Sequence, residues 1–483
     1  MKRRLRPVRS HRRVRFRFTW PTLVLPILGL VLLARGDGVR APLAEREAAL
    51  AIAAQPSRGH LAQMDVEERT GTWTPATVAA VSAAPRLLSS GEFHLRLPGL
   101  VSGAIALGVA VVLGERLFAT RIGILAAALI LALPPGRRLL GAELGGEPIY
   151  LAAMLTALAA IRDMSEARAS AIVAGVASGI AIAIGGRDGL WLPVFAVLWL
   201  RMNHGLTARS FAIVVASALA SVALVTVAAE LWLGRWASPA ASLPAQLAAP
   251  QLARTRATDV EIFWSTLPLL PVAALGAASL PSGWTTNESL RFIVVWVLVA
   301  AASFALGGSP LPAYVAVLYA AAMLAVWGME RSRRTTSIAA VALCAALAAA
   351  TLRLPRAASE ERALDGWAVR ETGRFVWRTV PLERRVAASP AVQKRLAYYG
   401  RRPVDSLDDA GGLAGADYVI VTREIMRESQ RGTREATSGS RPGRPPRLRM
   451  IAEFGPWIIA RVVRGAPAAA SATPPAEPEA NAS

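Results

Sequence analysis

Apolar segments alternate with short polar links through most of the first 350 residues of this chain. Residues 92–160 set the pattern, with an Arg-Leu-Pro entry at Arg96–Pro98, two apolar runs joined by a basic link, and a third run. The polar segment before the third run contains Glu143 and Glu147. Because hydrocarbon cannot hydrogen-bond a peptide backbone, repeated apolar segments of this length predict membrane-spanning helices.

Continuing the same count along the chain, we expect about eleven spans, to within one or two. The apolar runs lie at residues 19–34, 97–115, 121–135, 148–161, 169–184, 189–201, 209–233, 265–281, 291–306, 310–328 and 335–352.

The basic residues predict how these spans are oriented. Residues 1–18 are strongly basic, and every link on the same side of the membrane contains arginine, the link at 282–291 being the weakest case. By the positive-inside rule, this places the N-terminus in the cytoplasm. A cleaved signal peptide is the competing interpretation of the N-terminus, but no small-x-small cleavage motif follows the first run, which favours an uncleaved helix. An odd number of spans puts the C-terminal part outside.

Polar segments outside the spans complete the predicted organisation. Residues 36–90 form a large first outer loop, in which Pro42–Ala54 and Ala76–Leu88 have the composition of interfacial helices. After the last run, RLAYYG and ADYVIVTRE are typical of short strands, and MIAEFGPWIIARVV of a strand or hairpin. We therefore expect a mainly α, polytopic membrane protein with a small C-terminal α/β domain outside the membrane. The expected parts are a basic cytoplasmic N-terminus at 1–18, a transmembrane domain at 19–352, the α/β domain at 353–464 and a disordered tail at 465–483.

Composition supports a membrane protein and excludes several classes. The 483 residues are 54% hydrophobic, and the formal net charge is +21. Such a charge suggests nucleic-acid binding in a soluble protein, but here the arginines flank apolar runs, so membrane orientation explains them and no nucleic acid is expected. The only cysteine, Cys344, excludes a disulfide within the chain.

Common catalytic motifs are absent from the sequence. It has no Walker A lysine, no HExxH, no CxxC and no GxSxG, and its four histidines are scattered. An ATP-driven pump and a zinc enzyme are therefore not expected. No strong metal site is visible, and whether a divalent metal is needed stays open.

The remaining chemistry consists of carboxylates and arginines in the expected outer links. Glycosyl transfer from a lipid phosphate needs a carboxylate that takes a proton from the acceptor, and cations that hold the departing phosphate. The candidate residues are Glu45, Glu47, Glu143, Glu147, Arg137, Arg138 and Arg187. Most of them have a simpler alternative: a solvated helix face for Glu45 and Glu47, a favourable helix-dipole position for Glu147, and lipid headgroup contacts for Arg137 and Arg138. Arg187 could simply pair with Asp188 across a tight turn.

Three stretches, taken in order, resemble the polyprenyl-phosphate-sugar glycosyltransferases of the GT-C fold, which include protein O-mannosyltransferases and lipid A aminoarabinose transferases. They are EFHLRLPGLVSGAIALGVAVVLGERLFATRIGILAAALILALPP, GEPIYLAAMLTALAAIRD and FALGGSPLPAYVAVLYAAAMLAV. The resemblance covers most of residues 19–425. It implies a polyprenyl-phosphate-linked sugar donor, a lipid, glycan or protein acceptor, and a place in the bacterial inner membrane among membrane lipids.

The resemblance also assigns roles to candidate residues. The family's catalytic acid in the first outer loop is matched by Glu45, with Glu47 second, and its later acidic position is matched by Glu147. Arg187 takes the place of a lysine-bearing turn, and Arg137 and Arg138 would hold the phosphate with it. Both acidic positions hold Glu where the family has Asp, which moves each carboxylate by roughly one bond, and a misplacement of about 1 Å can cost on the order of a hundredfold in rate.

Two other functions therefore stay open. A catalytically degenerate relative could keep the fold in a binding or assembly role. A transporter is the third reading, but the sequence shows no internal repeat of the kind that transporters often contain.

Overall fold

The structure is a computed structural model of the chain, and it separates into two compact units. The first unit contains most of the chain up to Arg356, and the second contains Pro42–Ile52 and the chain from Ala357 on. The structure describes residues 24, 26–31, 42–54, 73–88, 91–132, 140, 144–163, 168–203, 208–233, 288–306, 311–331, 356–408, 415–428 and 447–463.

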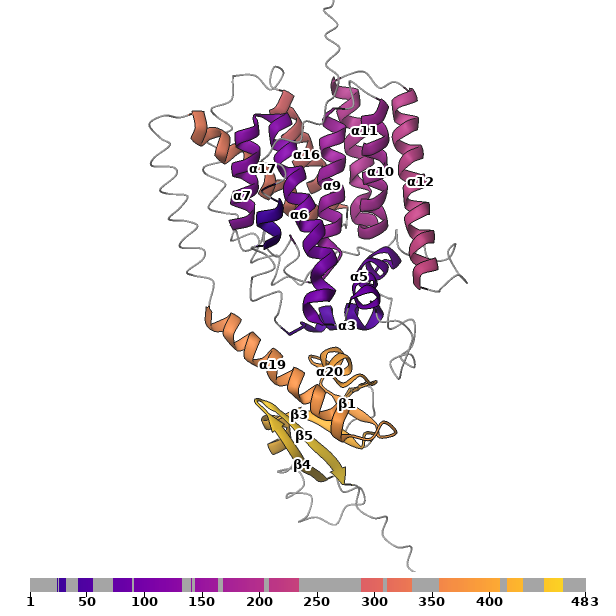
Figure 1. The fold of residues 1–483 in the computed structure, drawn as a ribbon, viewed down its shortest axis with the longest axis vertical. Helices are drawn as coiled ribbons and strands as arrows, with labels where there is room; N and C mark the ends of the chain where they lie inside the picture. Colours follow the sequence, from indigo (N-terminus) through magenta and orange to yellow (C-terminus); the bar gives the residue numbers. More distant parts are fainter. Residues whose placement is uncertain are drawn as a thin grey trace, which may run out of the picture. The chain divides into compact units, whose positions relative to one another are not determined.

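The first unit is a bundle of helices (Figure 1). Its helices are α5 (Pro75–Leu87), α6 (Glu92–Leu117), α7 (Thr120–Ala132), α9 (Glu147–Arg162), α10 (Arg168–Gly185), α11 (Trp191–Asn203), α12 (Ala208–Leu233), α16 (Glu288–Ala305) and α17 (Leu311–Arg331), with a single 3-10 turn, η3 (Arg187–Gly189). The described residues of the apolar runs expected between 97 and 233 and between 291 and 328 are mostly helical. The described part of the run at 19–34 is helical too. The runs expected at 265–281 and 335–352, like Cys344, lie outside the described residues.

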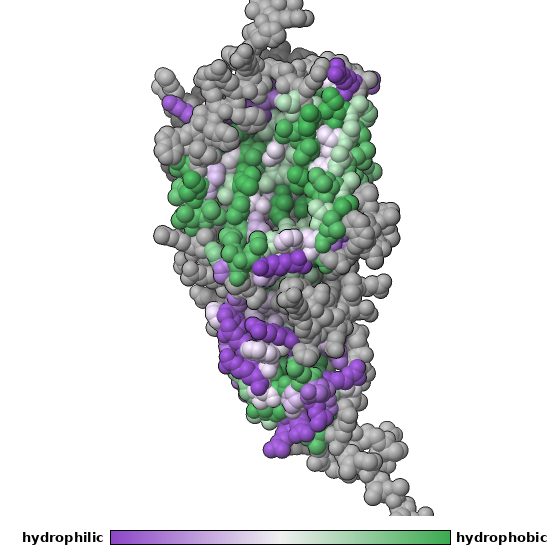
Figure 2. All heavy atoms as spheres, turned by 45° about the vertical axis from the view of Figure 1, so that its right-hand side comes forward, coloured by the Kyte–Doolittle hydropathy of each residue, from purple (hydrophilic) through white to green (hydrophobic). Residues whose placement is uncertain are grey.

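Three helices are long and apolar enough to cross a membrane, and they are Glu92–Leu117, Arg209–Leu233 and Glu288–Ala305. Thr120–Leu131, Ala169–Gly185 and Leu311–Trp327 are shorter apolar helices. Figure 2 shows hydrophobic side chains gathered on the visible face of the helical unit. The helical, apolar character that the sequence predicts is confirmed, while the full count of about eleven spans stays a prediction.

Close packing of α10 on α12 depends on glycine. A Cβ atom added to Gly175 would lie 1.8 Å from Ser217 Oγ and 2.6 Å from the backbone oxygen of Val214. A Cβ atom on Gly179 would lie 2.5 Å from the backbone oxygen of Ala218. Small residues let helix backbones approach in this way, which is the usual source of helix association in membranes.

Aromatic packing joins α11 to α16. Phe195 and Trp199 lie one turn apart on α11, and both meet Phe292 edge-on, with ring centroids 5.1 and 4.8 Å away. Edge-to-face pairs of this kind add roughly 0.5–1.5 kcal/mol beyond their buried area. The pairs fix α16, which begins far along the chain, against α11.

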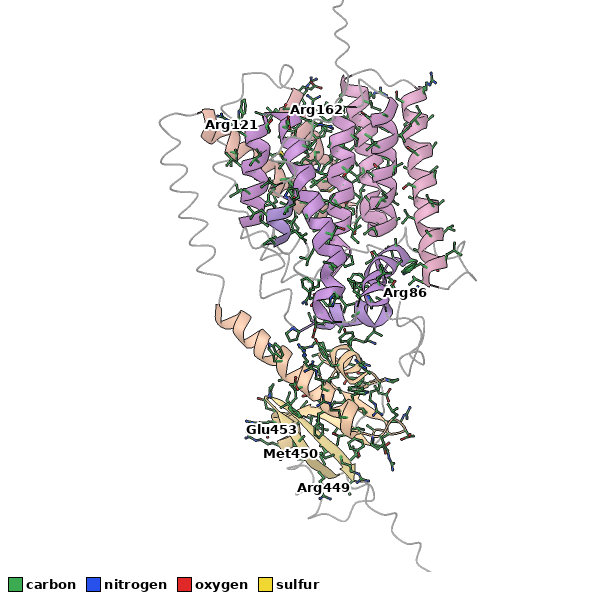
Figure 3. The ribbon with its side chains drawn as sticks, viewed as in Figure 1. Arg86, Arg121, Arg162, Arg449, Met450 and Glu453 are labelled. Atoms are coloured by element: carbon green, nitrogen blue, oxygen red, sulfur yellow. The ribbon has the colours of Figure 1, made fainter. Side chains whose placement is uncertain are left out.

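Polar contacts at one end of the bundle involve the basic links. Arg116, near the end of α6, pairs with Asp163 at 2.8 Å, and Arg162, near the end of α9, pairs with Glu288 at 2.6 Å. Ser289 also donates a hydrogen bond to the backbone oxygen of Leu117. Figure 3 places Arg121 at the same end of the bundle as Arg162. The ends of α6 and α9 and the start of α16 thus lie together.

Helix α5 is attached to the last turns of α12. Arg86 donates to the backbone oxygen of Trp232 at 2.6 Å and lies over the indole ring, 4.8 Å from its centroid. The indole N–H of Trp232 donates to Ser82 Oγ at 2.7 Å. Figure 3 shows Arg86 at the opposite end of the bundle from Arg162.

The second unit is built on a five-stranded sheet in the order β2-β1-β3-β5-β4. Its elements are α3 (Glu45–Ala54), α19 (Arg356–Thr379), β1 (Val386–Ala388), α20 (Gln393–Gly400), β2 (Asp405–Ser406), β3 (Tyr418–Thr422), β4 (Arg447–Phe454) and β5 (Trp457–Val463). Strand β1 is parallel to β2 and β3, whereas β5 is antiparallel to β3 and β4. Buried residues from three strands form one core face: Ala387, Val419, Val421, Ile458, Ala460 and Val462.

Two expectations for this unit are confirmed and one is wrong. Residues of ADYVIVTRE form β3, and the C-terminal hairpin is β4–β5. RLAYYG is not a strand, because these residues belong to helix α20. Leu396, Tyr398 and Tyr399 are buried there, and a Cβ atom on Gly373 of α19 would lie 2.6 Å from Tyr399 Cβ, so close packing on α19 outweighs the strand propensity of tyrosine.

A buried arginine holds the turn after α19. Arg402 is 2% exposed, and its guanidinium donates to the backbone oxygens of Val380 and Pro381, both at 3.0 Å, and to Leu382 at 3.1 Å. Burial lowers the pKa of Arg402, and nearby Glu383 acts in the opposite direction. The backbone carbonyl oxygens directly after α19 thereby accept charge-assisted hydrogen bonds from Arg402.

Candidate functional site

Glu147 lies at the start of α9 and is buried. It is 8% exposed and follows Gly145 and Gly146. A Cβ atom on Gly145 would lie 1.8 Å from Glu147 Oε2, so the carboxylate occupies the space that a side chain at 145 would need. A carboxylate in the first helical turn is stabilised by the helix dipole, and Pro148 suits the first turn because it lacks an N–H.

The turn between α10 and α11 is attached to this first turn of α9. The hydroxyl of Tyr150 donates to the backbone oxygen of Asp188 at 2.8 Å and accepts from the indole N–H of Trp191 at 2.9 Å. Asp188 is fully buried, with 0% exposure. Gly186, two residues before Asp188, has φ of 56°, a conformation that favours glycine. Asp188, a second acidic residue, is thus connected through its backbone oxygen to the first turns of α9.

The start of α5 completes this group of residues. Thr74 caps α5, accepting from the N–H of Thr77 at 3.2 Å, and its hydroxyl donates to the backbone oxygen of Ile184 at 3.1 Å. A Cβ atom on Gly146 would lie 2.7 Å from Thr77 Oγ1 and 3.2 Å from Ile184 Cγ2. The starts of α5 and α9 and the end of α10 therefore meet. We call Thr74, Thr77, Gly145–Glu147, Tyr150 and Gly186–Asp188 the α9-start site.

Arg187 lies in the same turn and contacts a further helix. Its guanidinium donates to the backbone oxygen of Leu306, directly after α16. A guanidinium has five N–H donors in a planar fork, so binding one carbonyl leaves capacity for an anion. Arg187 and Glu147 thus lie at one end of the helical unit, and their roles in one site stay a prediction.

Glu47 has a local structural contact. It is 7% exposed, and its Oε2 accepts from the backbone N–H of Ala44 at 2.8 Å. Glu45 is the first residue of α3, so Glu47 occupies the third helical position and makes the carboxylate half of a capping box. The backbone N–H of Leu43 donates to the hydroxyl of Tyr399 at 2.8 Å, so the segment directly before α3 is attached to α20 of the second unit.

Several predicted site residues stay untested. The side chain of Glu45 lies outside the described part of the structure, as do Arg137, Arg138 and Glu143. Because α3 belongs to the second unit and Glu147 to the first, the expected convergence of these carboxylates stays a prediction. Within the described residues, no group of three His, Cys, Asp or Glu could hold a metal ion.

Some polar residues of this region were missed in the sequence. Tyr150, Thr74 and Thr77 gave no signal, because their partners lie far along the chain. Outside this site, Glu230, 6% exposed near the end of α12, could have been found as a carboxylate inside an apolar run.

Comparisons with known proteins identify the fold. No protein-family model matches the chain, and no curated protein matches it by sequence. ArnT from Cupriavidus metallidurans in the apo state is similar in structure, with a TM-score of 0.62 and 14% identity over 90% of this chain and 97% of that one. The same protein bound to undecaprenyl phosphate gives 0.59.

A second similar structure is the oligosaccharyltransferase AglB from Archaeoglobus fulgidus, solved with an inhibitory peptide and a dolichol-phosphate. Its TM-score is 0.52 at 10% identity, over 84% of this chain and 70% of that one. ArnT and AglB are both polyprenyl-phosphate-sugar transferases of the GT-C fold. The chain described here has the GT-C fold, which confirms the resemblance noted in its sequence at the level of architecture.

Proposed function

We propose that this chain is an integral membrane glycosyltransferase, which moves a sugar from a polyprenyl-phosphate donor to a lipid, glycan or protein acceptor. The GT-C fold carries the proposal, because the similarity to ArnT extends over 97% of that protein. The α9-start site supports it, since buried Glu147 and Asp188 lie at the bundle end where Arg187 also lies.

The reaction assigns a task to each residue. The acceptor hydroxyl oxygen attacks the anomeric carbon, the bond from that carbon to the phosphate oxygen breaks, and polyprenyl phosphate leaves with the electron pair. Glu45, or Glu47 in its place, takes the hydroxyl proton. Glu147 orients the sugar or the acceptor, with Glu143 assisting. Arg187 holds the phosphate, together with Arg137 and Arg138.

The proposed setting is the bacterial inner membrane. The link arginines, including Arg116, Arg121 and Arg162, would face the cytoplasm with the N-terminus, because positive charge is retained on that side. The α9-start site, at the opposite end of the bundle, and the C-terminal unit would then face outward.

Donor-dependent transfer in membrane vesicles tests this function. Vesicles with and without the chain receive polyprenyl phosphates that carry different radiolabelled sugars, and label that enters lipid, glycan or protein is counted. Transfer that requires the chain supports the proposal. Glu45→Gln and Glu47→Gln at equal abundance then distinguish the two candidate bases, since loss of the base typically costs on the order of 10²–10⁴-fold in rate.

A non-catalytic relative is the second candidate. The observation that favours it is the contact of Glu47 with the backbone of Ala44, which gives this carboxylate a structural reason to be present. Binding of polyprenyl phosphate without transfer from any donor would support this alternative.

A further inference from the structure

Helix α19 exposes two tryptophans along one face. Trp367 is 47% exposed and Trp377 is 44% exposed, and they lie about three helical turns apart. The opposite face of the same helix is buried, with Val369 at 0% and Val376 at 1% exposure. Large aromatic side chains that are exposed together on one face often mark an interaction surface.

Arginines accompany both tryptophans. The guanidinium of Arg370 lies 4.7 Å from the ring centroid of Trp367, and that of Arg401 lies 4.6 Å from the ring centroid of Trp377. Arg374 and Arg378 project from the same side of the helix, and the one acidic residue among them, Glu371, pairs with Arg374 at 2.9 Å. We call Trp367, Arg370, Glu371, Arg374, Trp377, Arg378 and Arg401 the Trp–Arg face.

The position of α19 in the chain restricts what can cover this face. The helix begins at Arg356, and the apolar run expected as the last span ends at residue 352. The intervening residues can extend at most about 3.6 Å each, so α19 would begin within roughly 11–14 Å of the end of that span. If the run at 335–352 crosses the bilayer, α19 starts at the membrane surface.

We propose that the Trp–Arg face binds the surface of the membrane that carries the protein, with the arginines on anionic phospholipid headgroups. Tryptophan rings prefer the headgroup level, where the apolar ring and the polar N–H are both accommodated. Arginine binds phosphate through paired N–H donors, and several arginines close to an anionic leaflet add their attractions. This inference goes beyond the proposed function and does not depend on it.

A membrane surface explains both halves of the face. A soluble acidic polymer would match the arginines but leave much of the two indoles exposed to water. A neutral apolar partner would cover the indoles but leave the net positive charge of the face, four arginines against Glu371, uncompensated. The lipid interface provides an apolar layer directly beside phosphates, so it can accommodate the indoles and the guanidinium groups together.

A single fluorescent label tests the contact in the full chain. In a Cys344→Ser background, Glu371→Cys places the label within the Trp–Arg face, and Arg449→Cys places a control label on β4, which Figure 3 shows on the sheet away from α19. Each protein is reconstituted in nanodiscs of phosphatidylcholine with or without phosphatidylglycerol, with headgroup spin-labelled lipid as quencher. We expect several-fold stronger quenching at 371 than at 449, greater in anionic discs and weaker in about 1 M salt, where screening is nearly complete.

Two double variants separate the contribution of the arginines to membrane binding from that of the tryptophans. Arg374→Gln with Arg378→Gln should reduce the ratio of membrane-bound to unbound Trp–Arg face, measured from the quenching, by roughly 10–30-fold in anionic discs. Trp367→Ala with Trp377→Ala should reduce quenching in both lipids, and circular dichroism checks that the fold is kept. Equal quenching at 371 and 449, or quenching at 371 that ignores lipid charge and salt, would overturn the proposal. Protection of the 371 label by a soluble acidic polysaccharide, without any effect of lipid, would overturn it in favour of a glycan surface.

Discussion

Single polar side chains hold the α9-start site together. The hydroxyl of Tyr150 both donates to the Asp188 carbonyl and accepts from Trp191, and Thr74 connects the start of α5 to the end of α10. Each bond lies in a buried region, where an unmade hydrogen bond costs more than the same bond contributes at a surface. The geometry around Glu147 therefore depends on residues that have no part in the chemistry themselves.

We expect Tyr150→Phe to destabilise the first unit by about 1–3 kcal/mol, because it leaves a buried carbonyl and a buried indole N–H without their partner. The thermal unfolding midpoint of the detergent-solubilised protein measures the effect. Tyr319→Phe is the matched control, since the Tyr319 hydroxyl is buried with no hydrogen-bond partner within the described residues. Equal midpoints for the two variants would show that the Tyr150 bonds do not stabilise the site.

At the level of elements, α10 packs closely on α12 because glycines of α10 have no side chain. Gly175 lies against Ser217 and the backbone at Val214, leaving no room for a larger residue. The same close approach holds α12 against α10, and the turn directly after α10 is part of the α9-start site.

Gly175→Val should separate α10 from α12 and cost about 1–3 kcal/mol through overpacking, because the nearest atoms include rigid backbone. Thermal unfolding in the same detergent gives the size of the loss. Ala169→Val, at an exposed position of the same helix, adds a similar volume without a close neighbour and should change little. A midpoint unchanged in Gly175→Val would mean that these helices are not as close as described.

The sequence predicts the helices of the first unit well, because membrane spans are encoded by local apolar runs. It predicts the α20 segment wrongly and gives no sign of α19 as an element. Both helices are stabilised by their packing in the second unit rather than by local pattern, as the contact of Gly373 with Tyr399 shows.

The candidate site was predictable in part, for a related reason. Glu147 and Arg187 stand out locally, as charged residues at the borders of apolar runs. Tyr150 and Thr74 do not, because their partners lie 38 and 110 residues away. The attachment of Leu43 to Tyr399 spans 356 residues and was equally invisible.

At the scale of the whole molecule, the C-terminal unit includes a piece of the N-terminal part of the chain. Pro42–Ile52, which includes most of α3, belongs to the second unit. Leu43, just before the helix, is 1% exposed, and Leu50 within it is 0% exposed. The segment that the family resemblance assigns to the catalytic base thus folds with residues that follow the spans.

Ending the chain after residue 355 should therefore expose α3. We expect limited proteolysis to cut within 42–54 much faster in the shortened protein than in the full chain, because the apolar residues of α3 lose their partners. Removal of 465–483 alone is the control and should leave the cleavage pattern unchanged. Equal protection of 42–54 in both shortened proteins would contradict the assignment of α3 to the second unit.

A comparison of transfer rates among three proteins tests whether glycosyl transfer depends on the site at the start of α9. Reconstituted wild type, Glu147→Gln and Glu115→Gln receive the same labelled polyprenyl-phosphate sugar; Glu115 lies at the opposite end of the first unit, beside Arg116. We predict that Glu147→Gln loses on the order of a hundredfold or more in transfer, while Glu115→Gln keeps the wild-type rate. Equal rates for all three proteins would contradict a site at Glu147, and no transfer by wild type from any donor would contradict the function itself.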